Sequence, residues 1–293
     1  MQSPNFRIEA IEDVKLIAAP PLSDMYVLSP FVWTNGGFEL LVRAVNHADN
    51  PLEKVARVYH GTSSDGLEFT MREQPAIPPG PGAEDRDGCE DPTVVLFEEK
   101  LYVFYTGWNQ SAERGQLLLA VGANSDALQK VKVAVPSTDK WKNPKEATVV
   151  RAPDGTWRLF LEFARENASR IACGVSDSLE GRWDLSDGPV FTRLGWDDWH
   201  LSPGPVVDYR GQPLMFYNGA TRDAKWRIGW VVLDRGYATI IGRCRDPLIV
   251  PPQVTGDDTD IAFAASALNV EGKIWLYYSI SDKDMKRATL VLQ

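Results

Sequence analysis

The fold of this chain is decided by two runs, Asp91-Pro92-Thr93-Val94-Val95 and, after a turn, Leu101-Tyr102-Val103-Phe104-Tyr105. An apolar run, a turn and a second apolar run that ends in aromatic residues predict two antiparallel strands joined by a hairpin. The same unit recurs four more times, at 29–33 with 38–43, 147–150 with 157–161, 204–207 with 213–217, and 265–268 with 274–278. Five copies of one unit predict a repeat architecture.

The period of the repeat indicates which architecture this is. With Gly36, Glu99, Gly155, Gly211 and Gly272 taken as the turns, the units are spaced roughly 56 to 63 residues apart, a little above the usual length of a propeller blade. A third apolar segment follows in three units, at 56–59, 117–120 and 171–174, and predicts an antiparallel meander. We therefore expect an all-β, five-bladed β-propeller that occupies residues 1–293 as one domain, with inner strands that open into a central funnel.

The composition of the chain argues against several classes of binding partner. A net charge of −9 and the absence of a Lys/Arg cluster argue against a nucleic-acid partner. The apolar runs are too short to cross a bilayer and the N-terminus lacks a secretion signal, so no membrane partner and a cytoplasmic location are expected. Three scattered cysteines and three separated histidines predict reduced thiols and neither a metal site nor a cofactor. A homo-oligomer stays open.

One motif carries a family resemblance. The run Gly88-Cys89-Glu90-Asp91-Pro92, placed before a hydrophobic strand, resembles the Gly-x-Glu-Asp-Pro signature of glycoside hydrolase family 130. Six further segments resemble other motifs of that family, in the same order; they are residues 41–44, 64–66, 202–205, 217–219, 226–229 and 277–282. The resemblance covers most of the chain and implies an enzyme that cleaves β-mannosides of short oligosaccharides, with a single aspartic acid as proton donor.

By this resemblance Asp91 is the general acid. Burial in a funnel beside Glu90 and Asp65 would raise its pKa, because desolvation and like charge both disfavour the ionised form. The alternative is a turn residue that caps a backbone amide.

The group that accepts the mannosyl residue is predicted from a difference between this chain and the phosphorylases of the family. Phosphorylases of the family are described as binding phosphate with two arginines and a histidine, whereas this chain places Glu162 and Asn218 at an Arg and the His position, and the other Arg falls near Gln116. A carboxylate repels a phosphate dianion. An inverting hydrolase instead needs a carboxylate base that activates water. Glu162 is the expected base, since it interrupts an apolar strand, and Glu146 is its alternative.

Other polar side chains are expected to contact the sugar. Arg43 interrupts an apolar strand, and its guanidinium group can donate two hydrogen bonds to sugar hydroxyls or to Asp91. His200 lies among aromatic and acidic residues, and the resemblance implies that Asp282 accepts from a hydroxyl. The full expected substrate-binding set is Arg43, Asp65, Glu90, Trp108, Lys145, His200, Asn218 and Asp282.

The leading hypothesis is thus an inverting hydrolase of β-linked mannosides. The first alternative is a phosphorylase that recruits Lys145, Arg165 or Arg222 for phosphate. The second is a catalytically silent sugar-binding propeller. Five-bladed hydrolases of arabinans and fructans share the expected architecture, but they need a carboxylate trio and the order of the motifs ranks them lower.

Overall fold

The computed structural model describes residues 4–253 and 259–292 and is all-β, with five four-stranded units that we number as sheets 1 to 5. Sheet 1 contains β3 (Met25–Thr34), β4 (Phe38–Asn46), β5 (Ala56–Ser63) and β6 (Glu68–Met71), and β2 (Lys15–Ile17) adds to β6 in parallel. Sheet 2 contains β7 (Gly88–Phe97), β8 (Lys100–Asn109), β9 (Arg114–Gly122) and β10 (Gln129–Val135). Sheet 3 contains β11 (Lys142–Arg151), β12 (Trp157–Arg165), β13 (Ala168–Ser176) and β14 (Asp184–Asp187).

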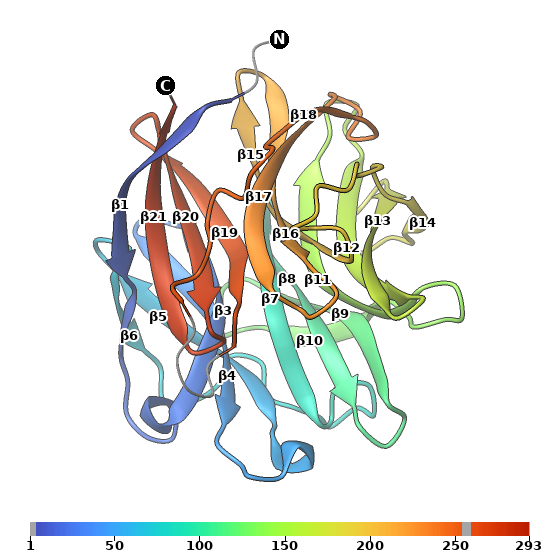
Figure 1. Ribbon diagram of the computed structural model, residues 1–293. Coiled ribbons are helices and arrows are strands. Elements are labelled where there is room, and N and C mark those ends of the chain that lie inside the picture. The colour runs from blue at the N-terminus through green and yellow to red at the C-terminus, as the bar shows by residue number, and fades with distance from the viewer. Residues whose placement is uncertain (1–3, 254–258, 293) are drawn as a thin grey trace.

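Sheet 4 contains β15 (His200–Tyr209), β16 (Gln212–Ala220), β17 (Trp226–Leu233) and β18 (Ile240–Arg243). Sheet 5 combines β19 (Ala262–Val270), β20 (Lys273–Ile280) and β21 (Asp284–Leu292) with β1 (Phe6–Asp13), so both ends of the chain meet in it, as the blue and red strands of Figure 1 show. Two 3-10 turns, η1 (Leu22–Asp24) and η2 (Pro51–Glu53), are the helical segments of the described residues, and neither has the length that crossing a bilayer requires.

The five hairpins expected from the repeat are confirmed as the first two strands of the five sheets. All five turn residues adopt the left-handed backbone, with φ values of 74° at Gly36, 60° at Glu99, 85° at Gly155, 76° at Gly211 and 80° at Gly272. Four of these turns use glycine, the residue that takes this conformation without a steric cost.

The first strands of the sheets contact one another in a cycle. β3 contacts β7, β7 contacts β11, β11 contacts β15, β15 contacts β19, and β19 returns to β3. Sheets 1 and 2 are also linked by a parallel pairing of Ala56 with Gly88. The first strands of all five sheets therefore converge on one region.

Each neighbouring pair of sheets shares an apolar core. Four hydrophobic clusters fill the spaces between sheets 1 and 2, between 2 and 3, across 3, 4 and 5, and between 5 and 1. The second strand of every sheet contributes fully buried side chains to these clusters, among them Leu40, Phe104, Phe160, Phe216 and Leu276. Strands whose two faces are both covered read as continuous apolar runs, which explains the pattern of the repeat.

Each first strand contains an irregularity, and in the first three sheets it places a polar side chain near the region of convergence. The register with the second strand shifts between Leu28 and Phe31 in β3 and between Glu90 and Thr93 in β7, and similar shifts occur in β11, β15 and β19. Such bulges bend a strand and redirect side chains. In the first three sheets the bulge holds a left-handed residue, which is Ser29, Asp91 or Glu146.

Candidate active site

A cavity of about 300 Å³ lies where the five sheets converge. Its polar and charged lining comes from Ser29, Arg43, Lys54, Asp91, Lys145, Glu146, Glu162, Ser279 and Asp282. Its aromatic lining comes from Tyr26, Trp226 and Phe263. A concave site with apolar walls and a few converging polar groups suits a small ligand such as a sugar.

A second cavity of about 500 Å³ adjoins the first. The two share Arg43, Val45, Lys54, Lys145 and Glu162. The second cavity is lined in addition by Glu90, Trp108, Gln110, Asn143 and Ser169 from sheets 2 and 3. Together the two cavities offer room for more than one sugar ring.

Asp91 is buried at the bulge of β7 and lines the first cavity. Its Oδ1 accepts a hydrogen bond from Ser29 Oγ at 2.7 Å, and Arg43 Nη1 lies 3.3 and 3.4 Å from its two oxygens. Burial raises the pKa of Asp91, but the charge of Arg43 and the Ser29 bond outweigh it and hold the pKa below its usual value. The expected upward shift is therefore wrong, because Arg43, for which the sequence left hydroxyls or Asp91 as partners, contacts Asp91, and Asp65 does not line the cavity.

Glu146 carries the upward shift instead. It occupies the bulge of β11 and lines the same cavity as Asp91. Desolvation and the charge of Asp91 raise its pKa well above the usual value, against the opposing charge of Lys145. Burial likewise raises the pKa of Glu90, whose Oε1 lies 2.9 Å from Arg43 Nη2. The site thus holds two half-buried acids with raised pKa values next to an aspartate whose pKa is lowered.

Glu162 is buried in β12, where it pairs with Lys145 of β11 in the sheet register. Its Oε1 accepts from Ser169 Oγ at 2.6 Å and lies 3.3 Å from Lys145 Nζ. This charge raises the pKa of Lys145. The Ser169 backbone N–H also donates to His200 Nδ1 at 3.1 Å, and desolvation lowers the pKa of His200. A positioned carboxylate and an ammonium group therefore face the cavity together.

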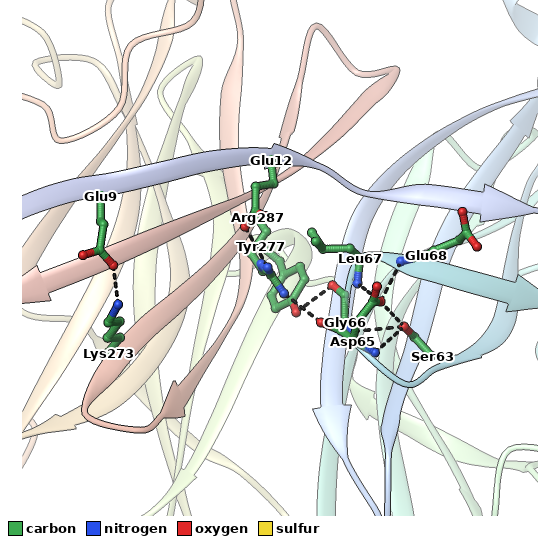
Figure 2. Close-up of polar contacts among 10 residues, drawn as sticks. All are labelled: Glu9, Glu12, Ser63, Asp65, Gly66, Leu67, Glu68, Lys273, Tyr277 and Arg287. Carbon is green, nitrogen blue, oxygen red and sulfur yellow. Dashed lines mark hydrogen bonds and ion pairs between the residues drawn. The ribbon is translucent and has the colours of Figure 1, made fainter.

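Asp65 does not join this site, contrary to expectation. It is exposed in the turn after β5, and its Oδ1 accepts from the backbone N–H groups of Leu67 and Glu68 and from Ser63 Oγ (Figure 2). The neighbouring Gly66 carbonyl accepts from Tyr277 Oη at 2.9 Å. The turn holds sheets 1 and 5 together and contributes no lining to either cavity.

Asn218 is also placed outside the cavities. Its amide is fully buried between β16 and β19, where Nδ2 donates to the Ala264 carbonyl at 3.2 Å and Oδ1 accepts from the Ala264 N–H at 2.7 Å. Asn218 consequently links sheets 4 and 5 and has no side-chain atom to offer a sugar. Gln116 is buried as well and lines neither cavity.

The remaining predicted residues divide between the two cavities. Asp282 lines the first cavity and Trp108 the second. His200 lines neither; it lies behind Ser169, with its ring centroid 5.5 Å from that of Trp226. Of the acidic residues that precede His200, Asp197 is buried in the core, where it accepts from Tyr217 Oη at 2.7 Å.

Of the cations considered for phosphate, only Lys145 lines the cavities. Arg165 pairs with Asp187 at 2.9 Å on the surface, and Arg222 lies over the Trp199 ring. Lys54, which the sequence analysis did not identify, is exposed directly after η2 and lines both cavities.

Sequence reasoning also missed the two serines that bind the carboxylates. Ser29 had a detectable signal, because Ser29-Pro30 and Asp91-Pro92 begin equivalent units of the repeat. Ser169 had none, since its role depends on the pairing of β12 with β13. The aromatic lining formed by Tyr26, Trp226 and Phe263 was also missed, because these residues come from three different sheets.

Comparison with known proteins shows which family the chain is similar to. The model of glycoside hydrolase family 130, described as β-1,4-mannooligosaccharide phosphorylase, matches residues 34–291. A curated β-1,2-mannobiose phosphorylase of Thermoanaerobacter sp. (strain X514) is 23% identical over 291 residues, which cover 86% of this chain and 85% of that protein. A 1,2-β-oligomannan phosphorylase of the same strain is 22% identical.

Solved structures share the fold. A β-1,2-mannobiose phosphorylase from Listeria innocua, in complex with β-1,2-mannobiose, superposes with a TM-score of 0.78 at 16% identity over 93% of this chain and 92% of that one. Another structure is described with the words that the family "contains glycoside hydrolases that target beta-1,2 mannosidic linkages in Candida mannan"; it has a TM-score of 0.77 at 18% identity over 98% and 95% of the two chains. Since the family model spans most of its length, this chain belongs to glycoside hydrolase family 130.

Proposed function

We propose that this protein cleaves β-mannosides with Asp91 as the proton donor, and that its five sheets are the blades of one propeller domain. The observation that carries the proposal is the position of Asp91, buried at a bulge yet lining a cavity that all five sheets share. A carboxyl group that Ser29 and Arg43 hold at the wall of this cavity is placed to exchange a proton with a bound sugar.

The relatives favour phosphate as the acceptor of the mannosyl group, over the water that the sequence analysis expected. Both curated relatives are named as phosphorylases of β-1,2-linked mannosides. Lys54 and Lys145 line both cavities and are the cations available to a phosphate ion there, because Arg43 is already engaged by Glu90 and Asp91. We therefore propose phosphorolysis of a β-1,2-mannoside as the first candidate reaction.

Hydrolysis is the second candidate, and one observation favours it. Glu162 presents a buried carboxylate to the cavity, and Lys145 and Ser169 bind the same oxygen, Oε1, which leaves Oε2 to accept a proton from water. An inverting glycosidase needs such a base across the sugar from its acid. The description of one similar structure names hydrolases within the family.

Incubation with β-1,2- and β-1,4-mannobiose, each with and without phosphate, tests both candidates. Mannose 1-phosphate formed only with phosphate supports phosphorolysis, whereas free mannose at the same rate in both buffers supports hydrolysis. Binding of mannobiose without either product would refute the enzyme and favour a sugar-binding protein.

A further inference from the structure

The first strands of neighbouring sheets are joined by side-chain hydrogen bonds at equivalent positions of the repeat. Aligned on the apolar run that follows each bulge, every first strand contributes three residues, which we call its bulge triplet. The triplets of sheets 1 to 5 are Ser29-Pro30-Phe31, Asp91-Pro92-Thr93, Glu146-Ala147-Thr148, Pro203-Gly204-Pro205 and Ala264-Ala265-Ser266.

Three triplets end in a residue with a hydroxyl group, and each of these hydroxyls makes the same bond. It donates to the backbone carbonyl of the second residue in the triplet of the next sheet. The bonds run from Thr93 to Ala147, from Thr148 to Gly204 at 2.8 Å, and from Ser266 to Pro30 at 2.8 Å. They link sheets 2 and 3, 3 and 4, and 5 and 1.

The other two triplets end in Phe31 and Pro205, which have no hydroxyl to donate. Between sheets 4 and 5, the Asn218 amide bonds to the backbone of Ala264 instead. Between sheets 1 and 2, the bond is the one from Ser29 Oγ to Asp91 Oδ1 at 2.7 Å. The cycle of hydrogen bonds around the five sheets is thus closed by the side chain of the proposed proton donor.

Ser266 holds the bulge that carries Ser29. Its buried hydroxyl accepts from the Val32 N–H at 2.9 Å and donates to the Pro30 carbonyl, so one side chain binds the backbone at two points. Ser29 precedes Pro30 and has a φ of 54°, a conformation that costs energy in a residue other than glycine and persists only where the surroundings hold it. Ser279 adds one bond to the Ser29 N–H and leaves the bulge closed by Ser266.

We propose that Ser266 is a positioning residue for the proton donor: it closes the bulge of β3, and the closed bulge keeps the Ser29 hydroxyl on Asp91. The proposal rests on the function proposed above, in which Asp91 delivers the proton. It holds for phosphate and for water as the acceptor, because Ser266 lines neither cavity and acts on the acid alone.

The pH dependence of activity reports this contact. A donated hydrogen bond favours the ionised carboxylate, so loss of the Ser29 contact raises the pKa of Asp91. The other charged groups that face Asp91 stay in place when Ser266 is changed. They are Arg43 of β4, Glu90 of β7, Lys145 and Glu146 of β11, and Asp282 after β20.

Ser266→Ala removes both bonds to the bulge of β3. On β-1,2-mannobiose kcat should fall by about 10-fold or more, because the acid is no longer held in place. The alkaline limb of kcat/KM should move to higher pH, in the same direction as for Ser29→Ala. In the double variant the limb should lie where Ser29→Ala alone puts it, since the effect passes through the Ser29 hydroxyl; additive shifts would refute the proposal.

Thr148→Val is the matched control, because it removes a buried bond of the same kind between sheets 3 and 4. It should lower the melting temperature much as Ser266→Ala does and keep the pH profile of the wild type. If Ser266→Ala changes only the melting temperature, or if both variants shift the profile equally, Ser266 is merely structural and the proposal is refuted.

Infrared titration separates the positioning role from the proposed function. The Asp91 carboxyl band is the one that is missing in Asp91→Asn, and its midpoint should lie at higher pH in Ser266→Ala than in the wild type. An unmoved midpoint, in a protein that cleaves mannosides, refutes the positioning role. A moved midpoint in a protein that cleaves no mannoside refutes only the proposed function. Should Ser266→Ala not fold, Ser266→Cys keeps the shape with a weaker donor, and an unmoved midpoint there overturns the proposal.

Discussion

The ammonium nitrogen of Lys145 lies 3.3 Å from Oε1 of Glu162, inside the cavity that both residues line. The same oxygen accepts from Ser169 Oγ, so the carboxylate is held from two sides. Lys145 is 43% exposed and lines both cavities, so its ammonium group is accessible from them. A negative charge on Glu162 both offers a base to water and competes with phosphate for Lys145, so this ion pair links the two candidate reactions.

Glu162→Gln should therefore change the acceptor. The amide can keep the contact with Ser169 but no longer neutralises Lys145 or accepts a proton from water. Release of free mannose in phosphate-free buffer should fall by about 10²-fold or more, and the KM for phosphate should fall as Lys145 becomes available. Product chromatography over a phosphate titration measures both. Asp187→Asn, which breaks the surface pair with Arg165, is the control, and equal behaviour of the two variants would show that Glu162 has no part in acceptor choice.

Asp91→Asn should abolish cleavage while the fold persists, because the amide keeps the shape of the side chain but delivers no proton. The expected loss is about 10²- to 10⁴-fold in kcat. Initial rates on β-1,2-mannobiose, alongside circular dichroism and a thermal melt, check both parts. A folded variant that retains a tenth of the wild-type rate or more would show that another group is the acid.

Ser29→Ala should move the pH dependence of activity upward. The Ser29 hydroxyl donates to Asp91 Oδ1 at 2.7 Å and so lowers the pKa of that carboxyl. Without the donor the proton is held more tightly, and activity that needs it should persist to higher pH. The measurement is kcat/KM against pH. Ser279→Ala is the control, since Ser279 lines the same cavity and binds the Ser29 backbone N–H but is not bonded to Asp91. Identical profiles for both variants would contradict the assignment.

Phe160→Ala should destabilise the whole chain. Phe160 is fully buried in the cluster that joins sheets 3, 4 and 5. Truncation of a buried aromatic costs about 3–5 kcal/mol of unfolding free energy. Urea unfolding followed by two spectroscopic probes measures this loss. Val190→Ala, at an 88% exposed position, should change almost nothing. Two separate transitions in either variant would argue against a single domain.

Much of the fold follows from the sequence because its determinants are local. Alternation, apolar runs and turn residues predict each hairpin without knowledge of its neighbours, and all five hairpins form. The site is less predictable because a motif gives the position of a residue and not the direction of its side chain. Asp65 binds its own turn, and Asn218 binds the backbone of Ala264, 46 residues away in sequence. The Lys145–Glu162 pair depends on two register shifts in β11 that no pattern indicates.

The pairing of β1 with β21 has a consequence for how the chain is made. Residues 6–13 are synthesised long before residues 286–292, with which they pair. During synthesis β1 therefore remains without its sheet while the other units can already pair locally. Contacts so distant in sequence form slowly, and an unpaired strand edge invites association with other chains. A nascent chain interrupted before residue 284 should thus be a substrate for chaperones, even though sheets 1 to 4 are complete within it.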